Sequence, residues 1–94
     1  MIRRSTSSPE AVKVTFAVDH PDPVSVVGDF NGWDPHAHPL VRRSNGLRSV
    51  AVTLPAAATF RFRYLGAGGT WFDDGGADAL EPNGLGGTHS VLRT

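Results

Sequence analysis

The amino-acid sequence predicts an all-β protein, an immunoglobulin-like sandwich of about seven short strands. Short segments in which apolar and polar residues alternate recur along the chain, as expected for half-buried strands. Turn-forming Gly, Pro, Asn and Asp residues separate these segments about every 8 to 12 residues. No segment shows the sustained 3.6-residue period of an amphipathic helix. The chain has no cysteine, so the disulfide of antibody domains is not part of this sandwich.

The first third of the chain contains a polar start and two predicted strands. We expect residues 1–9 to form a disordered tail, because they lack a periodic burial pattern that would offset the entropy of ordering them. The folded domain is then expected over residues 10–94. Its first strand, over residues 10–18, carries the alternating apolar residues Val12, Val14, Phe16 and Val18. A proline-containing break separates it from a second strand over residues 24–28, and an Asn-Gly turn follows.

The remaining strands are predicted over residues 40–42, 47–54, 59–65, 70–73 and 90–93. The clearest alternation lies in residues 59–65, where three aromatic side chains share one side. If these aromatic residues face the core, Arg63 must face solvent. A Gly-rich hairpin turn precedes residues 70–73, and a long Gly-rich connection precedes the closing strand.

Charge and composition exclude several classes of partner. Nine Lys and Arg residues balance nine Asp and Glu residues, whereas a protein that binds nucleic acid through phosphates normally carries a basic excess. Without cysteine, neither a thiolate nucleophile nor a thiolate metal site can form. No apolar run approaches the roughly 20 residues that span a bilayer, so no membrane partner is expected. The start of the chain lacks the apolar stretch of a secretory signal, and we expect a cytoplasmic location.

Two tryptophans lie in or beside glycine-containing turns, which favours a surface that binds sugar. Trp33 follows Asn31-Gly32, and Trp71 follows two glycines and a threonine. A glucose ring presents an apolar face of C–H groups and an equator of hydroxyls, so flat aromatic rings and flexible donors suit it. Ordinary packing at the rim of the core remains the alternative interpretation for each tryptophan taken alone.

An ordered series of motifs resembles the family-48 carbohydrate-binding modules. The run from Val26 to Trp33 is similar to the family's G-x-F-N-x-W signature. The resemblance continues through residues 62–65, Trp71 and residues 81–87, and so covers nearly the whole chain from residue 11 to 92. The family includes the glycogen-binding domain of the AMP-activated protein kinase β subunit. It also includes the N-terminal early-set domains of isoamylases and glycogen branching enzymes.

The resemblance implies an early-set fold, an α-glucan ligand such as glycogen or starch, and a set of sugar-binding residues. The tryptophans match rings that stack on glucose, and Arg63 stands where kinase-type modules have a lysine donor. Leu85 matches a leucine that can enter the ring of a cyclic or helical glucan. His89 replaces an asparagine, and an imidazole can also donate or accept a hydrogen bond. The predicted carbohydrate-binding residues are Trp33, Arg63, Trp71, Leu85 and His89.

Catalysis and metal binding have weaker support. Asp73 and Asp74 are neighbours in one strand and should point to opposite faces, whereas glycosidase carboxylates face each other about 5–9.5 Å apart. His36 and His38 could form part of a metal site, but no third ligand is evident, and loop histidines are the favoured interpretation. We therefore expect neither a catalytic residue nor a metal or cofactor.

Two functions remain open at this stage. The first is non-catalytic binding of an α-glucan on a surface formed by aromatic side chains. The alternative is a protein-interaction or regulatory module that docks on a glycogen-metabolising enzyme and binds sugar weakly or not at all. The small size motivates the alternative, as do two departures from the family pattern: Gly87 stands where kinase-type modules have a threonine, and His89 where they have an asparagine.

Overall fold

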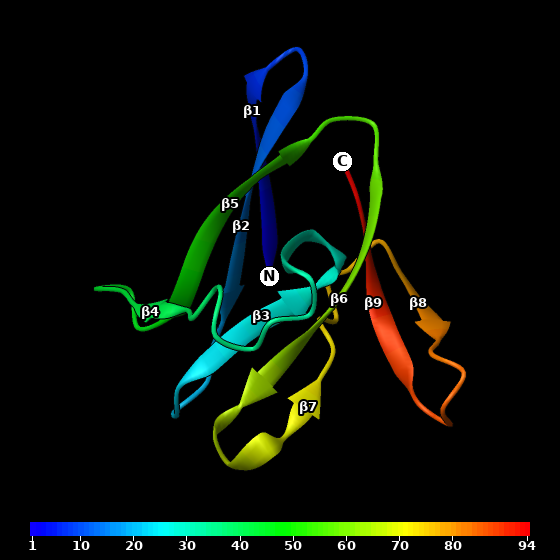
Figure 1. The fold of residues 1–94 in the computed structure, drawn as a ribbon. Helices are drawn as coiled ribbons and strands as arrows, with labels where there is room; N and C mark the ends of the chain where they lie inside the picture. The colour runs from blue at the N-terminus through cyan, green and yellow to red at the C-terminus, as the bar shows by residue number, and fades with distance from the viewer.

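The computed structural model describes residues 1–94 as two antiparallel β-sheets that form a sandwich, and it confirms the predicted all-β class (Figure 1). One sheet has the strand order β1-β2-β5-β4, and we call it sheet A. The other has the order β3-β6-β9-β8, with the short β7 paired to β6, and we call it sheet B. The strands are β1 (Ile2–Ser8), β2 (Ala11–Val18), β3 (Val24–Gly28), β4 (Val41–Arg42), β5 (Arg48–Pro55), β6 (Thr59–Gly66), β7 (Trp71–Phe72), β8 (Ala79–Pro82) and β9 (Thr88–Arg93).

The core lies between the sheets and is built by the period-2 alternation of both. Sheet A contributes Val14 and Phe16, and sheet B contributes Phe62, Tyr64 and Leu92, all of them fully buried. The rings of Phe16 and Phe62 meet edge to face with their centroids 5.1 Å apart, a favoured aromatic geometry. Because alternate residues point the other way, each sheet also has an outer face that is turned from the core.

The N-terminal segment differs from the expected disordered tail. Residues 2–8 form β1, which pairs antiparallel with β2 from Ile2 opposite Phe16 to Ser8 opposite Ala11. Most of its side chains are exposed, so the sequence shows little of the alternation that burial imposes. Backbone pairing holds the strand instead, together with Arg4, which bridges to Asp78 and donates from Nε to the Arg93 carbonyl at 3.1 Å. The sandwich therefore includes residues 1–9 and is not confined to residues 10–94.

The Gly-rich connection before the last strand also contains a strand that the sequence pattern does not reveal. β8 pairs with β9, with Glu81 opposite His89 and Pro82 opposite Thr88. β8 lies at the edge of sheet B and ends at Pro82. Proline has no backbone N–H to donate, and an edge strand tolerates this because it has a neighbour on one side only. Nine strands result, where about seven are predicted.

The structure contains no helix that is both long and apolar enough to cross a bilayer.

Candidate functional site

The candidate site occupies the outer face of sheet B. Side chains that pair directly across antiparallel strands share a face, and Trp71 pairs with Leu65. Arg63 lies two positions before Leu65 in β6 and so points to the same side. His89 pairs with Glu81 on β9 and β8, and it is two residues from Val91, which pairs with Arg61 of β6. Three predicted sugar-binding residues, Arg63, Trp71 and His89, therefore share one face.

Arg63 and Trp71 are in direct contact. The guanidinium carbon of Arg63 lies 5.9 Å from the centre of the Trp71 ring, within the range of a cation–π interaction. The Trp71 residue is 43% exposed, so much of its ring surface remains open to a ligand. The indole offers an apolar face, and the charged donor beside it can make hydrogen bonds to hydroxyl groups.

Asp73 holds the arginine from behind. Its Oδ1 atom lies 3.4 Å from Nε of Arg63, an ion pair that is too long or bent for a hydrogen bond, and Nε has no other partner. The same carboxylate accepts hydrogen bonds from Thr88 Oγ1 at 2.7 Å and from Ser90 Oγ at 3.0 Å. The terminal nitrogens of Arg63 donate no hydrogen bond within the chain and are not among its buried unpaired atoms. These nitrogens are consequently free to donate to a ligand.

His89 lies in a second polar cluster on the same face. Its Nε2 atom donates to Oε1 of Glu81 at 2.8 Å, and Nε of Arg61 donates to that oxygen at 2.5 Å. The hydrogen bond from His89 and then that from Arg61 lower the pKa of Glu81, and the Glu81 carboxylate raises the pKa of Arg61. The His89 side chain is only 16% exposed. Its geometry leaves it less accessible to a ligand than the ring of Trp71.

The predicted motif before Trp33 forms a one-turn 3-10 helix, Asp29–Asn31, followed by two left-handed residues. Asn31 fixes this turn: its Oδ1 accepts from the Gly28 amide at 3.1 Å, while its Nδ2 donates to the Val26 carbonyl at 3.1 Å and to His38 Nδ1 at 2.9 Å. Only glycine fits at position 28 without a steric clash, because a Cβ there would lie 2.5 Å from the Arg61 carbonyl oxygen.

Trp33 itself adopts a positive φ of 60°, which a bulky residue rarely does and which costs on the order of 1–3 kcal/mol. Its amide donates to the Gly28 carbonyl at 2.9 Å, so the turn holds the residue at the end of β3. The residue is 42% exposed. The structure therefore places the Trp33 ring at the surface and not in the core.

Leu85 is at the tip of the loop that joins β8 to β9 and is 90% exposed. The loop is closed by Asn83, whose Oδ1 accepts from the amides of Leu85 at 2.8 Å and Gly87 at 3.2 Å. Gly84 and Gly86, on either side of the leucine, both have positive φ. Single exposed apolar residues are common on protein surfaces, so the exposure of Leu85 alone does not assign it a role.

The five predicted residues are thus only partly joined. Arg63 and Trp71 touch, and His89 shares their face. No hydrogen bond, ion pair or aromatic contact links Trp33 or Leu85 to those three. Sequence reasoning missed Asp73 as the anchor of Arg63 and Glu81 as the partner of His89, because both roles depend on strand register.

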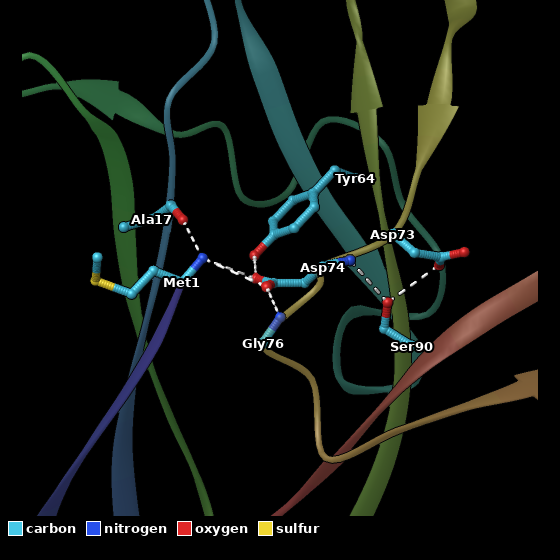
Figure 2. A network of polar contacts seen from close by, with 7 residues as sticks. All are labelled: Met1, Ala17, Tyr64, Asp73, Asp74, Gly76 and Ser90. Carbon is cyan, nitrogen blue, oxygen red and sulfur yellow. Dashed lines mark hydrogen bonds and ion pairs between the residues drawn. The ribbon is translucent and has the colours of Figure 1, made fainter.

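Asp73 and Asp74 point away from each other, as their neighbouring positions predict (Figure 2). Asp74 is buried and accepts from the Tyr64 hydroxyl at 2.6 Å, from the Gly76 amide at 2.8 Å and from the Met1 ammonium at 3.1 Å. Burial by itself would raise the pKa of the Asp74 carboxyl, but these hydrogen bonds, that of Tyr64 foremost, lower it. Burial first, and Asp74 second, raise the pKa of Tyr64.

The two loop histidines do not converge on a common centre. His38 is held by Asn31 and packs near the ring of Phe30, with centroids 5.8 Å apart. No group of three or more His, Cys, Asp and Glu side chains comes together anywhere in the chain. His36 lies instead beside a shallow hollow between β3 and β6.

Comparisons with known proteins connect the chain to enzymes of α-glucan chemistry. Over 58 residues it is 45% identical to the 1,4-alpha-glucan branching enzyme GlgB 2 of Xanthomonas campestris pv. campestris (strain 8004), which covers 58% of this chain and 8% of the enzyme. Over 65 residues it is 46% identical to the 1,4-alpha-glucan branching enzyme GlgB of Deinococcus radiodurans, which covers 64% of this chain and 9% of the enzyme.

A third relative is an alpha-amylase of Niallia circulans, 37% identical over 67 residues, which cover 62% of this chain and 5% of the amylase. The chain thus matches less than a tenth of the length of these relatives. No protein-family model matches it. The likeness concerns a short segment of each enzyme.

Proposed function

We propose that the chain is a non-catalytic module of α-glucan metabolism that binds α-1,4-linked glucose on the outer face of sheet B. The observation that carries the proposal is the contact between Arg63 and the exposed ring of Trp71. The indole offers an apolar surface to the C–H face of a glucose ring, and the free guanidinium nitrogens can donate to the hydroxyls at its edge.

Two exposed apolar residues add to this surface in the proposal. Trp33 extends from the turn after β3, and Leu85 extends from the loop between β8 and β9. The strain at Trp33 supports a functional role, because a left-handed bulky residue persists only where the surrounding structure holds it. His89 supplies a further polar group, although Glu81 already engages its Nε2 atom.

The relatives support the choice of ligand. The names of the branching enzymes specify a 1,4-alpha-glucan as what they act on. Because this chain matches only a short segment of each, we carry over the glucan and not the reaction. An early-set module similar to that of the kinase β subunit and a cytoplasmic location belong to the same proposal.

We propose that the module is non-catalytic because its carboxylates are not arranged as a facing acid and base. Glycosidase chemistry needs an acid and a base that face each other across the bond to be cleaved. Here Asp73 is held by Thr88 and Ser90, and Asp74 is turned into the interior toward Tyr64. Glu81 accepts hydrogen bonds from the guanidinium of Arg61 and the imidazole of His89.

The alternative, a docking module for a glycogen-metabolising enzyme, has one supporting observation. The four strands of sheet A carry five cationic side chains and no carboxylate: Arg3, Arg4, Lys13, Arg42 and Arg48. Only Arg3 and Lys13 lie on the outer face, because Arg4 pairs with the buried Val14 and Arg48 pairs with Val18 on the core side. This small basic patch lies opposite the proposed sugar surface and suits an acidic partner. A complex with a purified glycogen-metabolising enzyme that persists in excess maltoheptaose and is lost in Lys13→Glu would favour this alternative.

Titration with maltoheptaose tests the main proposal through the emission of the two tryptophans. We expect saturable binding that weakens at least tenfold in Trp71→Ala, with Lys13→Ala on the opposite face as the matched control. Absence of any response at millimolar sugar, or a response that Trp71→Ala and Trp33→Ala leave unchanged, would contradict it. Incubation of the same protein with maltoheptaose should release no shorter sugars.

A further inference from the structure

Four residues from four segments form a row across the outer face of sheet B. Trp71 of β7 pairs with Leu65 of β6, and Leu65 pairs with Ser25 of β3. Ser25 in turn forms an isolated bridge with Pro39 in the segment that follows the Trp33 turn. Figure 1 shows β3, β6 and β7 lying side by side in the sheet. The row therefore leads from the proposed sugar platform toward the chain that carries Trp33.

The row crosses a shallow hollow of about 240 Å³. Its walls come from the start of β3, from the turn after β6, and from the segment just after Trp33. Residues at its surface include Ser25, Pro35, His36, Pro39, Leu65 and Ala67. Pro35, Pro39 and Leu65 give it apolar C–H surface, while Ser25 and His36 give it hydrogen-bonding groups.

Neither polar group has a partner within the chain. The Ser25 hydroxyl and the His36 ring make no hydrogen bond or ion pair with other residues, whereas the neighbouring His38 ring is held by Asn31. The backbone of His36 is held at this place, because its amide donates to Oδ1 of Asp34 at 2.9 Å. An imidazole and a hydroxyl at the edge of an apolar hollow can donate to and accept from sugar hydroxyls.

We propose that this hollow is a second glucan-binding stretch, in which Ser25 and His36 contact glucose units beyond the one that stacks on Trp71. The inference rests on the proposed function, since it requires a glucan on Trp71. Adjacent strands lie about 4.8 Å apart, so the three steps of the row span roughly 14 Å. That length accommodates more than one glucose ring, so the site should prefer long oligosaccharides to short ones.

Calorimetric titration with maltotriose and maltoheptaose tests this preference. A hydrogen bond contributes about 0.5–1.5 kcal/mol net, so His36→Ala should weaken maltoheptaose binding roughly 2- to 10-fold while changing maltotriose binding by less than twofold. Ala67→Arg, which places a long side chain over the exposed rim of the hollow, should have the same selective effect. Lys13→Ala on sheet A is the matched control and should alter neither affinity.

The outcomes separate the two proposals. If the unaltered protein binds neither sugar, the proposed function fails. If it binds maltoheptaose through Trp71 but His36→Ala and Ala67→Arg bind both sugars as tightly as the unaltered protein, the proposed function stands and the second stretch is refuted. Equal losses for both sugars would also refute it, since they would place His36 at the Trp71 subsite.

Discussion

The guanidinium carbon of Arg63 lies 5.9 Å from the centre of the Trp71 ring, and the Asp73 carboxylate lies behind Nε of the same arginine. The ion pair with Asp73 favours an orientation of the arginine beside the indole. A positioned donor loses less entropy on binding than a free side chain, which favours affinity.

Substitutions at Arg63 should produce a graded loss of glucan binding. Arg63→Lys keeps the charge but loses the planar fork, and we expect a loss of roughly threefold. Arg63→Met keeps the aliphatic stem and removes every donor, so we expect a loss of tenfold or more, in line with about 1.5–3 kcal/mol for a hydrogen bond to a charged group. Calorimetry with maltoheptaose measures both, and equal affinities for Arg63→Met and the unaltered protein would contradict the role.

Leu85 offers a way to separate binding from stability. The side chain is almost fully exposed, so Leu85→Ser should change the free energy of unfolding by no more than about 0.5 kcal/mol. Partial burial of a leucine against a glucan is worth on the order of 1 kcal/mol, so affinity should fall roughly fivefold. Thermal unfolding and sugar titration of the same sample check the two effects. A large drop in Tm with unchanged affinity would assign the residue to the fold.

Tyr64 and Asp74 should govern stability in acid. The pKa of Asp74 is lowered in the folded chain, so its stabilising contribution is present above its ordinary pKa of about 3.9 and is lost as pH falls through the folded value. Tyr64→Phe removes the hydrogen bond that does most to lower this pKa, and it should cost about 1–3 kcal/mol near neutral pH. Acid unfolding, followed by circular dichroism, should then begin at a higher pH.

A double-mutant cycle controls for the loss of packing at this site. If Tyr64 acts through the carboxylate, Tyr64→Phe should cost much less in an Asp74→Asn background than in the unaltered chain. Equal costs in the two backgrounds would show that the hydroxyl acts independently of Asp74.

Substitution of Gly28 by alanine should destabilise the motif turn, and the same substitution at Gly75, outside the turn, is the matched control. In Gly28→Ala the new Cβ would lie 2.5 Å from the Arg61 carbonyl oxygen and 2.8 Å from Phe62 Cβ, so we expect a loss of about 1–3 kcal/mol. Gly75→Ala meets nothing within 4 Å and should be neutral or slightly stabilising. Denaturant unfolding compares them. Equal stabilities of the two variants would show that the turn can shift without cost.

The sequence predicts those strands well that bury one face. The alternation in residues 59–65 correctly identifies Phe62 and Tyr64 as core residues and Arg63 as outward-facing, because burial on one side imposes a period of two. β1 escapes this logic, since most of its side chains are exposed and its order depends on backbone pairing and on Arg4. A pattern of side chains cannot show pairing of the backbone.

The exposure of the candidate residues was predictable from the sequence, and their arrangement was not. Trp33, Trp71 and Leu85 stand out in the sequence as apolar residues beside glycines, and all three are exposed. The row from Trp71 to Pro39 depends on which residues of β7, β6 and β3 stand opposite one another, and that register is set by long-range pairing. One clue was present: Ser25 lies between Val24 and Val26, which marks it as facing away from the core.

The shortness of β7 has a dynamic consequence. Only Trp71 and Phe72 pair with β6, so this strand should open more readily than the long strands of the core. A glucan that spans β7, β6 and β3 would have to leave before β7 could detach. Amide hydrogen exchange at Trp71 and Phe72 should therefore slow as ligand is added. Amides of sheet A that exchange through local opening should keep their rates, and those that exchange only through global unfolding should slow with the stability of the whole domain.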